Sequence, residues 1–425
     1  MTTTAVSGTP VTDRRRAWTV VAMLLAFMLI NFMDKAVLGL AGGALTAELH
    51  LTATEFGAIG SAFYLLFSVS GIVVGGLATR IDSRWILTGM MIGWSVSQLP
   101  MLIPAAGAGV LFLTRITLGA AEGPAYAISN HAAFTWFPDR ERNLPASVLT
   151  LGAGLGVTIG VPILTVIITE YGWRWAFGFT AVTGLVWLVL WLRLGGEGPY
   201  GVRGGASAGP RVPYRKLLLN GTVVGGTLAT FTVYWTLALS LTWFPQYLQQ
   251  VKGYSLTEVG LLSVVWHTAG LAVILGTGFL TQRFLRRGVS SRVARGLVAG
   301  GAVATGGVAM VAMTLVDDAV PHLLLLTLSA SAGYIAFPLT QAGNAELTPD
   351  AQRSAVLGTT TAIATAAGAV APVLTGAVVQ RAADAATGFG AAFTIAGLLM
   401  VIGGVVAALT VNPERDKKKI NGGVA

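Results

Sequence analysis

The sequence predicts an all-α membrane protein that crosses the bilayer twelve times, as two pseudo-symmetric bundles of six helices. Three observations lead to this fold class: the composition, the number of apolar runs and the distribution of basic residues. Of the 425 residues, 54% are hydrophobic and 11% are charged, and the mean hydropathy is +0.72. Soluble domains carry about 25% charged residues. This chain therefore has too few charges to cover a water-facing surface.

Twelve apolar runs are each about 20 residues long, which is the length that spans roughly 30 Å of hydrocarbon. In the first half they lie near 17–40, 54–78, 85–107, 109–132, 145–169 and 173–194. In the second half they lie near 219–243, 257–281, 293–316, 320–343, 354–379 and 388–411. The glycines in the fifth run have the spacing of close helix packing and not of a phosphate-binding loop; they are Gly152, Gly154, Gly156 and Gly160.

Basic residues lie mostly on one side of the predicted spans. Of the 27 lysines and arginines, 22 fall in loops on the side of the two termini, three fall on the opposite side and two fall within spans. Under the positive-inside rule, this bias predicts that both termini are cytoplasmic. We expect a multi-pass protein of a cell membrane, most simply a bacterial inner membrane. The same bias accounts for the net charge of +9 without a nucleic-acid partner.

The two halves of the chain repeat one another. The pattern at 75–84, after the second span, recurs at 278–287 after the eighth, and Pro162 in the fifth span corresponds to Pro372 in the eleventh. Two parallel halves related by an axis along the membrane normal, with a site between them, are a transporter architecture. The predicted divisions are a cytoplasmic tail at 1–16, a bundle at 17–194, a Gly- and Pro-rich linker at 195–213, a bundle at 214–411 and a tail at 412–425.

Other function classes find little support in the sequence. The absence of cysteine excludes disulfides and thiolate metal sites. Neither a metal-ligand cluster nor a nucleophilic triad is apparent, so we expect no enzyme, no metal and no cofactor. A receptor built on the same scaffold remains an alternative, but the termini and the linker are too short for a sizeable signalling segment. We expect a functional monomer whose surroundings are the lipid bilayer.

Four charged residues fall at membrane depth. Asp34 and Lys35 lie in the first span, and Arg115 and Glu122 lie in the fourth. Seven residues bring Glu122 back to the face of Arg115, roughly 10 Å along a helix. Asp34 and Lys35 diverge by about 100°, so each is expected to meet a group on another helix. Charges at this depth are functional by default, and we expect all four around one polar cavity. The alternative is that they only brace the first and fourth helices.

Several motifs resemble the major facilitator superfamily, and within it the anion:cation symporter branch of sugar-acid and aromatic-acid carriers. The loop at 76–84 resembles the superfamily's cytoplasmic signature, with Thr79 and Asp82 at positions where Asp and Gly are usual. The branch is resembled at 31–35 (Asn-Phe-Met-Asp-Lys), 61–63, 115–124, 136–138, 141–142, 172–175 and 241–245. The resemblance implies twelve helices and proton-coupled uptake of a small organic anion, such as a carboxylate, by alternating access. A proton-antiport exporter of drugs or metabolites is the alternative.

The resemblance also implies roles for individual residues. Asp34 and Glu122 would couple transport to protons, and Lys35 and Arg115 would hold the substrate anion; Lys35 replaces the usual Arg and lacks its planar fork. The cytoplasmic gating loop would contain Arg80, Asp82 and Arg84. The substrate pocket would contain Phe32, Phe67, Ala153, Thr230, Thr361 and His267. Since sugar-acid carriers place Tyr, Gln and Asn at four of these positions, we expect an aromatic or lightly oxygenated acid. His267 could instead be a packed, neutral histidine.

Overall fold

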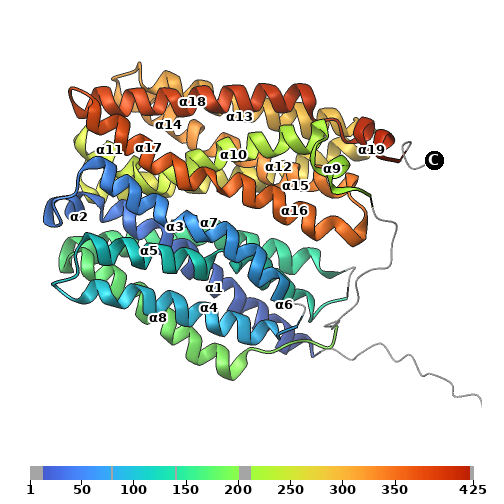
Figure 1. Ribbon diagram of the computed structural model, residues 1–425, viewed down its shortest axis with the longest axis horizontal. Helices are drawn as coiled ribbons and strands as arrows, with labels where there is room; N and C mark the ends of the chain where they lie inside the picture. Colours follow the sequence, from blue (N-terminus) through green and yellow to red (C-terminus); the bar gives the residue numbers. More distant parts are fainter. Residues whose placement is uncertain (1–12, 78–79, 139–140, 201–211, 422–425) are drawn as a thin grey trace, which may run out of the picture.

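The computed structural model describes residues 13–77, 80–138, 141–200 and 212–421, apart from a few side chains within them, and these residues form two helical bundles (Figure 1). The N-terminal half contains α1 (Arg14–Leu40), α2 (Gly42–Glu48), α3 (Ala53–Leu77), α4 (Ser83–Gln98), η1 (Leu99–Leu102), α5 (Ala108–Glu122), α6 (Ala125–Phe134), α7 (Asn143–Tyr171) and α8 (Trp173–Leu194). Short helices precede or follow the long ones in both halves.

The C-terminal half opens with α9 (Tyr214–Leu218). It then contains α10 (Gly221–Thr242), α11 (Phe244–Gln250), α12 (Leu256–Arg286), η3 (Arg292–Leu297), α13 (Val298–Met313), α14 (Ala319–Ser331), η4 (Ala332–Ile335), α15 (Ala336–Leu347), α16 (Asp350–Thr365), α17 (Ala367–Arg381), α18 (Ala385–Thr410) and α19 (Pro413–Asn421). Most of the predicted linker, 201–211, lies outside the described residues.

The predicted fold class is confirmed. Ten helical segments of the described chain are long and apolar enough to cross a membrane. The predicted third and fourth spans are also present but divided: the third continues from α4 into η1, and the fourth consists of α5 and α6. The sequence explains the second division, since Gly123 and Pro124 separate α5 from α6 and proline cannot continue a helical hydrogen-bond ladder. The sequence prediction missed this break and the short helices α2, α9, α11 and α19.

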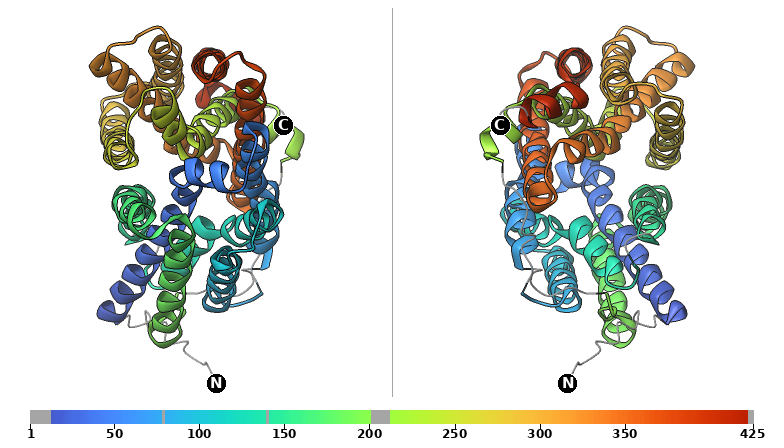
Figure 2. Two further views of the ribbon diagram at one scale, coloured as in Figure 1. Left: turned by 90° about the vertical axis from the view of Figure 1, so that its left-hand side faces the viewer. Right: turned by 90° about the vertical axis from the view of Figure 1, so that its right-hand side faces the viewer.

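The two bundles lie side by side with their helices roughly parallel to one axis (Figures 1 and 2). We call the face with the start of α1 and with α19 the terminal face, and the face with α2 and α11 the far face. The halves meet along two main seams, α3 against α16 and α17, and α7 against α12. The contacts identified along these seams run from the far face to about the middle of each helix: Gly260 lies against Thr165, Thr158 against Thr268, and Ser68 against Thr365.

The glycines of α7 pack as predicted. A side chain at Gly156 would lie 2.6 Å from the carbonyl oxygen of Leu29 in α1, and one at Gly160 would overlap Met33. Gly154 faces the other way and lies against Leu271 of α12, in the opposite half. Such close approach is how small residues hold membrane helices together. The arrangement fixes α1 beside α7 and so sets the depth of the charged residues that α1 carries.

Candidate functional site

The charged residues of α1 and α5 come together in the core of the N-terminal half. The exposed fractions are 1% for Asp34, 2% for Arg115 and 0% for Glu122, and the side chain of Lys35 is 9% exposed. Four charges in so little contact with water must compensate one another, because an isolated charge at membrane depth is costly. The predicted cluster is therefore present, although its members divide into two pairs.

The first pair is an ion pair between Lys35 and Glu122. The Lys35 ammonium lies 2.8 Å from a Glu122 carboxylate oxygen and donates a hydrogen bond of 2.5 Å to the side-chain oxygen of Asn31, one turn earlier in α1. Three phenyl rings surround the same ammonium: its distance to the ring centroid is 4.5 Å for Phe32 and 5.7 Å for both Phe63 and Phe67. Cations are attracted to aromatic faces at such distances.

Two glycines of the sequence place Glu122 in this cage. A side chain at Gly119 would lie 1.7 Å from the carbonyl oxygen of Phe63, and one at Gly123 would lie 2.0 Å from that of Phe67. Only glycine permits α5 to approach the backbone of α3 so closely, one turn before and one residue after Glu122. Because α5 ends at Glu122, the carboxylate sits at a helix break, opposite the phenyl rings of α3.

The second pair is looser: Arg115 interacts electrostatically with Asp34 and, to a smaller extent, with Glu122, but the part of the chain that the structure describes has no ion pair within 4 Å between Arg115 and Asp34. Both residues lie on the side of α1 that faces α8. The Arg115 guanidinium carbon lies 5.2 Å from the ring centroid of Phe177, and the Thr180 hydroxyl lies within hydrogen-bonding reach of Asp34. Both of these neighbours belong to α8. The divergence of Asp34 and Lys35 around α1, expected from helical geometry, therefore separates the four charges into an α3-facing and an α8-facing pair.

The predicted pocket positions are only partly brought together. Phe32 and Phe67 touch the Lys35 ammonium, as described. Thr230 instead bonds within the C-terminal half, to the carbonyl of Gly226 and to the Thr340 hydroxyl. Thr361 accepts a hydrogen bond of 2.7 Å from the side-chain nitrogen of Gln341. The side chain of Ala153 lies outside the described part of the structure.

His267 is buried in α12, with an exposed fraction of 6%. Its Nδ1 lies 2.8 Å from the carbonyl oxygen of Ser263, one turn earlier in the same helix, and its ring lies beside that of Trp266. This geometry is that of a packed histidine bonded to its own backbone. It favours the structural interpretation that the sequence left open.

The predicted gating loop is attached to its own half. Arg84 donates a hydrogen bond to the carbonyl of Leu192, and the indole of Trp191 donates one of 3.1 Å to the carbonyl of Arg84. These contacts join the start of α4 to the end of α8. Arg80 is exposed, Asp82 precedes α4, and Thr79 lies outside the described residues.

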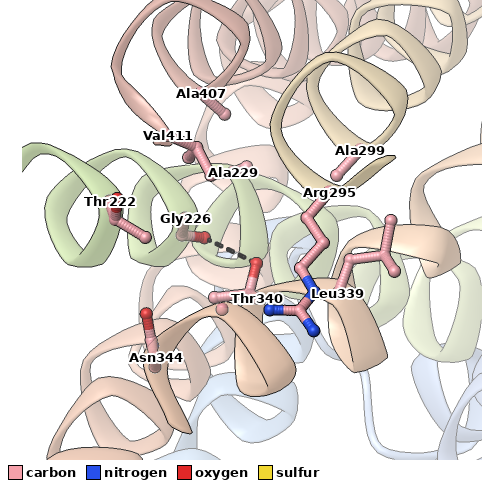
Figure 3. Close-up of a pocket in the computed structure, with 11 residues that line it drawn as sticks. Thr222, Gly226, Ala229, Arg295, Ala299, Leu339, Thr340, Asn344, Ala407 and Val411 are labelled. Atoms are coloured by element: carbon pink, nitrogen blue, oxygen red, sulfur yellow. Dashed lines mark hydrogen bonds between the residues drawn. The ribbon is translucent and has the colours of Figure 1, made fainter. Parts of the chain in front are cut away.

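A small cavity of about 10 Å³ lies elsewhere, between α10, η3, α15 and α18 near the terminal face (Figure 3). Arg295 and Asn344 are among its polar residues, and Thr340 there donates to the carbonyl of Gly226. None of the sequence-predicted site residues lines it. A volume of this size has room for about one water molecule, so this cavity does not correspond to the predicted substrate pocket.

Comparisons with known proteins identify the family of this chain. The model of the Major Facilitator Superfamily matches residues 23–335. The hexuronate transporter of Bacillus subtilis is 27% identical, over 93% of this chain and 94% of its own length. The probable sulfoacetate transporter of Cupriavidus necator is also 27% identical, over 93% of each chain, and the D-galactonate transporter of Escherichia coli is 28% identical over 66% of this chain and 70% of its own.

Solved structures share the fold. A bacterial homologue of the human lysosomal transporter Spinster, crystallised in an inward-facing and occupied conformation, superposes with a TM-score of 0.78 over 96% of this chain and 99% of its own, at 16% identity. A D-xylose–proton symporter gives 0.74 over 94% and 98%, also at 16% identity. The family match shows that the chain is a multi-pass membrane transporter, not an enzyme, and that it belongs to the Major Facilitator Superfamily.

Proposed function

We propose that this protein takes up a small organic anion, most simply a carboxylate, together with protons, by alternating access in a cell membrane with both termini in the cytoplasm. The observation that carries the proposal is the buried Lys35–Glu122 ion pair, 2.8 Å long, with the buried charges of Arg115 and Asp34 on the other side of α1. The relatives, which include a hexuronate transporter and a D-galactonate transporter, support an organic anion as the substrate.

Charge balance explains why such a site would couple an anion to a proton. The two cationic and two anionic side chains sum to zero, and the exposed fraction of each is below one tenth. An anion that entered alone would leave one uncompensated negative charge at low dielectric, which is strongly unfavourable. A proton on Glu122 would remove that charge and would release Lys35 from its partner. The substrate anion would then take the place of the Glu122 carboxylate beside Lys35.

Within this proposal the four charged residues have separate roles. Lys35 and Arg115 attract the substrate anion, whereas Glu122 and Asp34 carry the coupling protons. Lys35 supplies a point charge whose direction is fixed by Asn31 and by the phenyl cage. This arrangement offsets the loss of the planar fork that an arginine would offer. The Lys35 ammonium is thus already oriented for an anion and needs no change of rotamer to bind it.

The side chains around Lys35 also restrict the chemistry of the uncharged part of the substrate. A sugar acid needs a hydrogen-bond partner for every hydroxyl that leaves water, because a buried unpaired polar group costs about 1–3 kcal/mol. Phe32 and Phe67 offer none, and the Thr361 hydroxyl already accepts from Gln341. We therefore propose an aromatic or lightly oxygenated acid as the substrate.

A binding competition tests this choice. Benzoate- or phthalate-like acids should raise the apparent thermal stability of the purified protein at lower concentrations than gluconate- or galactonate-like acids, because a ligand of the folded state stabilises it by mass action. Phe67→Tyr adds one hydroxyl near the site. It should reduce the difference between the concentrations at which the two classes of acid stabilise the protein. A wild-type preference for the polyhydroxylated acids would contradict the aromatic assignment, and stabilisation by none of these anions would contradict the proposed function itself.

A further inference from the structure

The α17 helix contains a proline in its interior, on the seam between the two halves. Pro372 has no N–H, so the carbonyl of Gly368 loses its helical donor and the ladder is weakened around this point. The carbonyl of Pro372 accepts a hydrogen bond of 2.9 Å from the indole of Trp243, at the far end of α10. The Pro372 carbonyl is therefore hydrogen-bonded within the C-terminal half.

The next backbone donor is satisfied from the other half. The N–H of Val373 donates a hydrogen bond of 3.1 Å to the hydroxyl oxygen of Ser61 in α3. Hydroxyls on neighbouring helices commonly satisfy backbone groups around a proline in a membrane. Here the neighbouring helix belongs to the half that moves relative to α17 in a rocking transporter.

The seam around this hydrogen bond is tightly packed. A side chain at Gly57, one turn before Ser61, would lie 2.3 Å from the Pro372 carbonyl oxygen. One turn after Ser61, the Tyr64 ring occupies the space that a side chain at Gly368 would need, 2.4 Å from its position. Ser61 itself is 5% exposed, so water has little access to the bond while the seam is closed.

We infer that the Ser61–Val373 hydrogen bond is a latch that favours closure of the far face, with Ser61 as a positioning residue for the conformational cycle. The inference rests on the alternating-access part of the proposed function. Opening the far face must draw α3 away from α17, which breaks the bond and hands the Val373 N–H to water. Removing the hydroxyl takes this stabilisation from the closed state only, so the equilibrium moves toward the far-face-open state.

The natural sequence provides a clean reporter, because it contains no cysteine. Thr242 at the far end of α10 is 5% exposed and its methyl group lies 3.1 Å from the position of a side chain on Gly60 in α3. In a Thr242→Cys protein, reaction with a soluble maleimide in lipid nanodiscs therefore reports how often this seam opens. The readout needs neither substrate nor proton gradient.

Ser61→Ala on this background should increase the labelling rate about two- to tenfold, the range expected for one net hydrogen bond. Ser97→Ala is the matched control: Ser97 has the same exposed fraction of 5%, but its hydroxyl bonds to the Trp94 carbonyl of its own helix. This control should leave the rate unchanged. Equal rates for the two variants, or slower labelling of Ser61→Ala, would overturn the latch.

A second variant separates a latch from a general loosening of the seam. Pro372→Ala restores the N–H that donates to the Gly368 carbonyl and removes the ring that clashes with this carbonyl. The helix can then straighten and the Val373 N–H can donate to the Ala369 carbonyl, so adding Ser61→Ala to Pro372→Ala should change labelling much less than Ser61→Ala does alone. If the two substitutions multiplied the labelling rate independently of one another, the latch would be overturned. Ser61 would then not act through the helical backbone that Pro372 interrupts. Failure of every carboxylate in transport would overturn the proposed substrate but would leave these labelling results unaffected.

Discussion

The two halves of the protein share a helical scaffold but differ in the chemistry at their centres. The N-terminal half holds four buried charges on α1 and α5, whereas the central groups described in the C-terminal half are neutral: hydroxyls, an amide, a packed histidine and aromatic rings. The rings of Tyr234 and Tyr334, for example, both contact the ring of Phe337, at centroid distances of 4.9 and 5.6 Å. The duplication visible in the sequence therefore preserved the fold and not the polar site.

The ion pairs follow the same division. Six join described residues: Arg14–Glu141, Lys35–Glu122 and Arg174–Glu48 in the first half, and Lys252–Asp317, Arg295–Glu346 and Arg415–Asp416 in the second. None of these six crosses between the halves. In the proposed alternating-access cycle, charge pairs confined to one half keep their partners while the halves move, so binding of a proton or an anion, and not the movement, would change them. The contacts between halves described above are neutral hydrogen bonds and close packing, which water can replace at low cost.

The largest difference between the halves should appear when a central polar group is removed from each. Arg115→Ala removes the cation that interacts with both Asp34 and Glu122, and truncating one member of a set of buried, mutually compensating charges typically costs about 2–5 kcal/mol. Uptake into proteoliposomes should fall by at least about 30-fold, with 1.4 kcal/mol equal to tenfold. Arg115→Lys should restore little of it, because a point charge replaces a fork.

His267→Gln in the other half should change uptake by no more than about threefold, since a bond of the kind it makes to Ser263 contributes about 0.5–1.5 kcal/mol. Both variants are compared at equal amounts of folded protein. Near-normal uptake by Arg115→Ala, or an equally severe loss in His267→Gln, would contradict the proposal that the polar site lies in the N-terminal half.

The second comparison separates coupling from binding inside the N-terminal half. Glu122→Gln and Asp34→Asn mimic the protonated side chains, so neither variant should accumulate substrate against a gradient. The Glu122→Gln protein should still exchange labelled for unlabelled substrate when no pH gradient is present, because Lys35 remains available to the anion. Uphill accumulation by both variants would place the coupling proton on another group.

The smallest effects should come from two acidic anchors near the faces of the protein, one in each half. Asp416 is 2% exposed and accepts hydrogen bonds of 2.9 and 2.7 Å from the backbone N–H and the hydroxyl of Thr222, at the start of α10. Burial would raise the pKa of Asp416, but hydrogen bonds from Arg415 and Thr222 outweigh it and hold the pKa below its usual value. Glu48, at the far face, has a lowered pKa because the Trp173 indole and then Arg174 donate to it, but half of its side chain is exposed.

Asp416→Asn should lower the free energy of unfolding by about 0.5–2 kcal/mol at neutral pH, as loss of a helix-capping group does. A carboxyl whose folded pKa is depressed stabilises the fold above its unfolded pKa and loses this contribution as the pH falls through the folded value. The difference from wild type should therefore fade below about pH 4. Glu48→Gln should show the same sign with a smaller magnitude, and thermal unfolding at two pH values measures both. A larger loss for Glu48→Gln would contradict this ranking.

The sequence predicted most of the membrane-spanning helices because hydrocarbon thickness imposes a length on every span. The predicted spans fall on the observed helices to within a few residues, and α8 matches its prediction at both ends. Short helices escaped detection because they lie outside that constraint. The break after Glu122 is caused by Gly123 and Pro124. The sequence analysis did not predict it, because the residues on both sides continue the apolar run of the fourth span.

The gathering of the four buried charges could be predicted from the sequence, but not their pairing. Helical geometry indicated that Asp34 and Lys35 face different neighbours, yet which cation meets which anion depends on how closely α5 approaches α3 at Gly119 and Gly123. The pocket positions in the C-terminal half stay a prediction; their hydroxyls bond within that half, Thr230 to Thr340 and Thr361 to Gln341. Those partners are more than 15 residues away in the chain, and no spacing rule connects them.

The central claim is that the N-terminal charges exchange an anion and a proton together, and proton movement measures this most directly. Adding a transported aromatic carboxylate to weakly buffered proteoliposomes should raise the external pH, as protons enter with the anion, and Glu122→Gln should abolish the change while keeping exchange. External acidification would indicate a proton-antiport exporter. Uptake of the anion with no change in pH would contradict the proposed coupling.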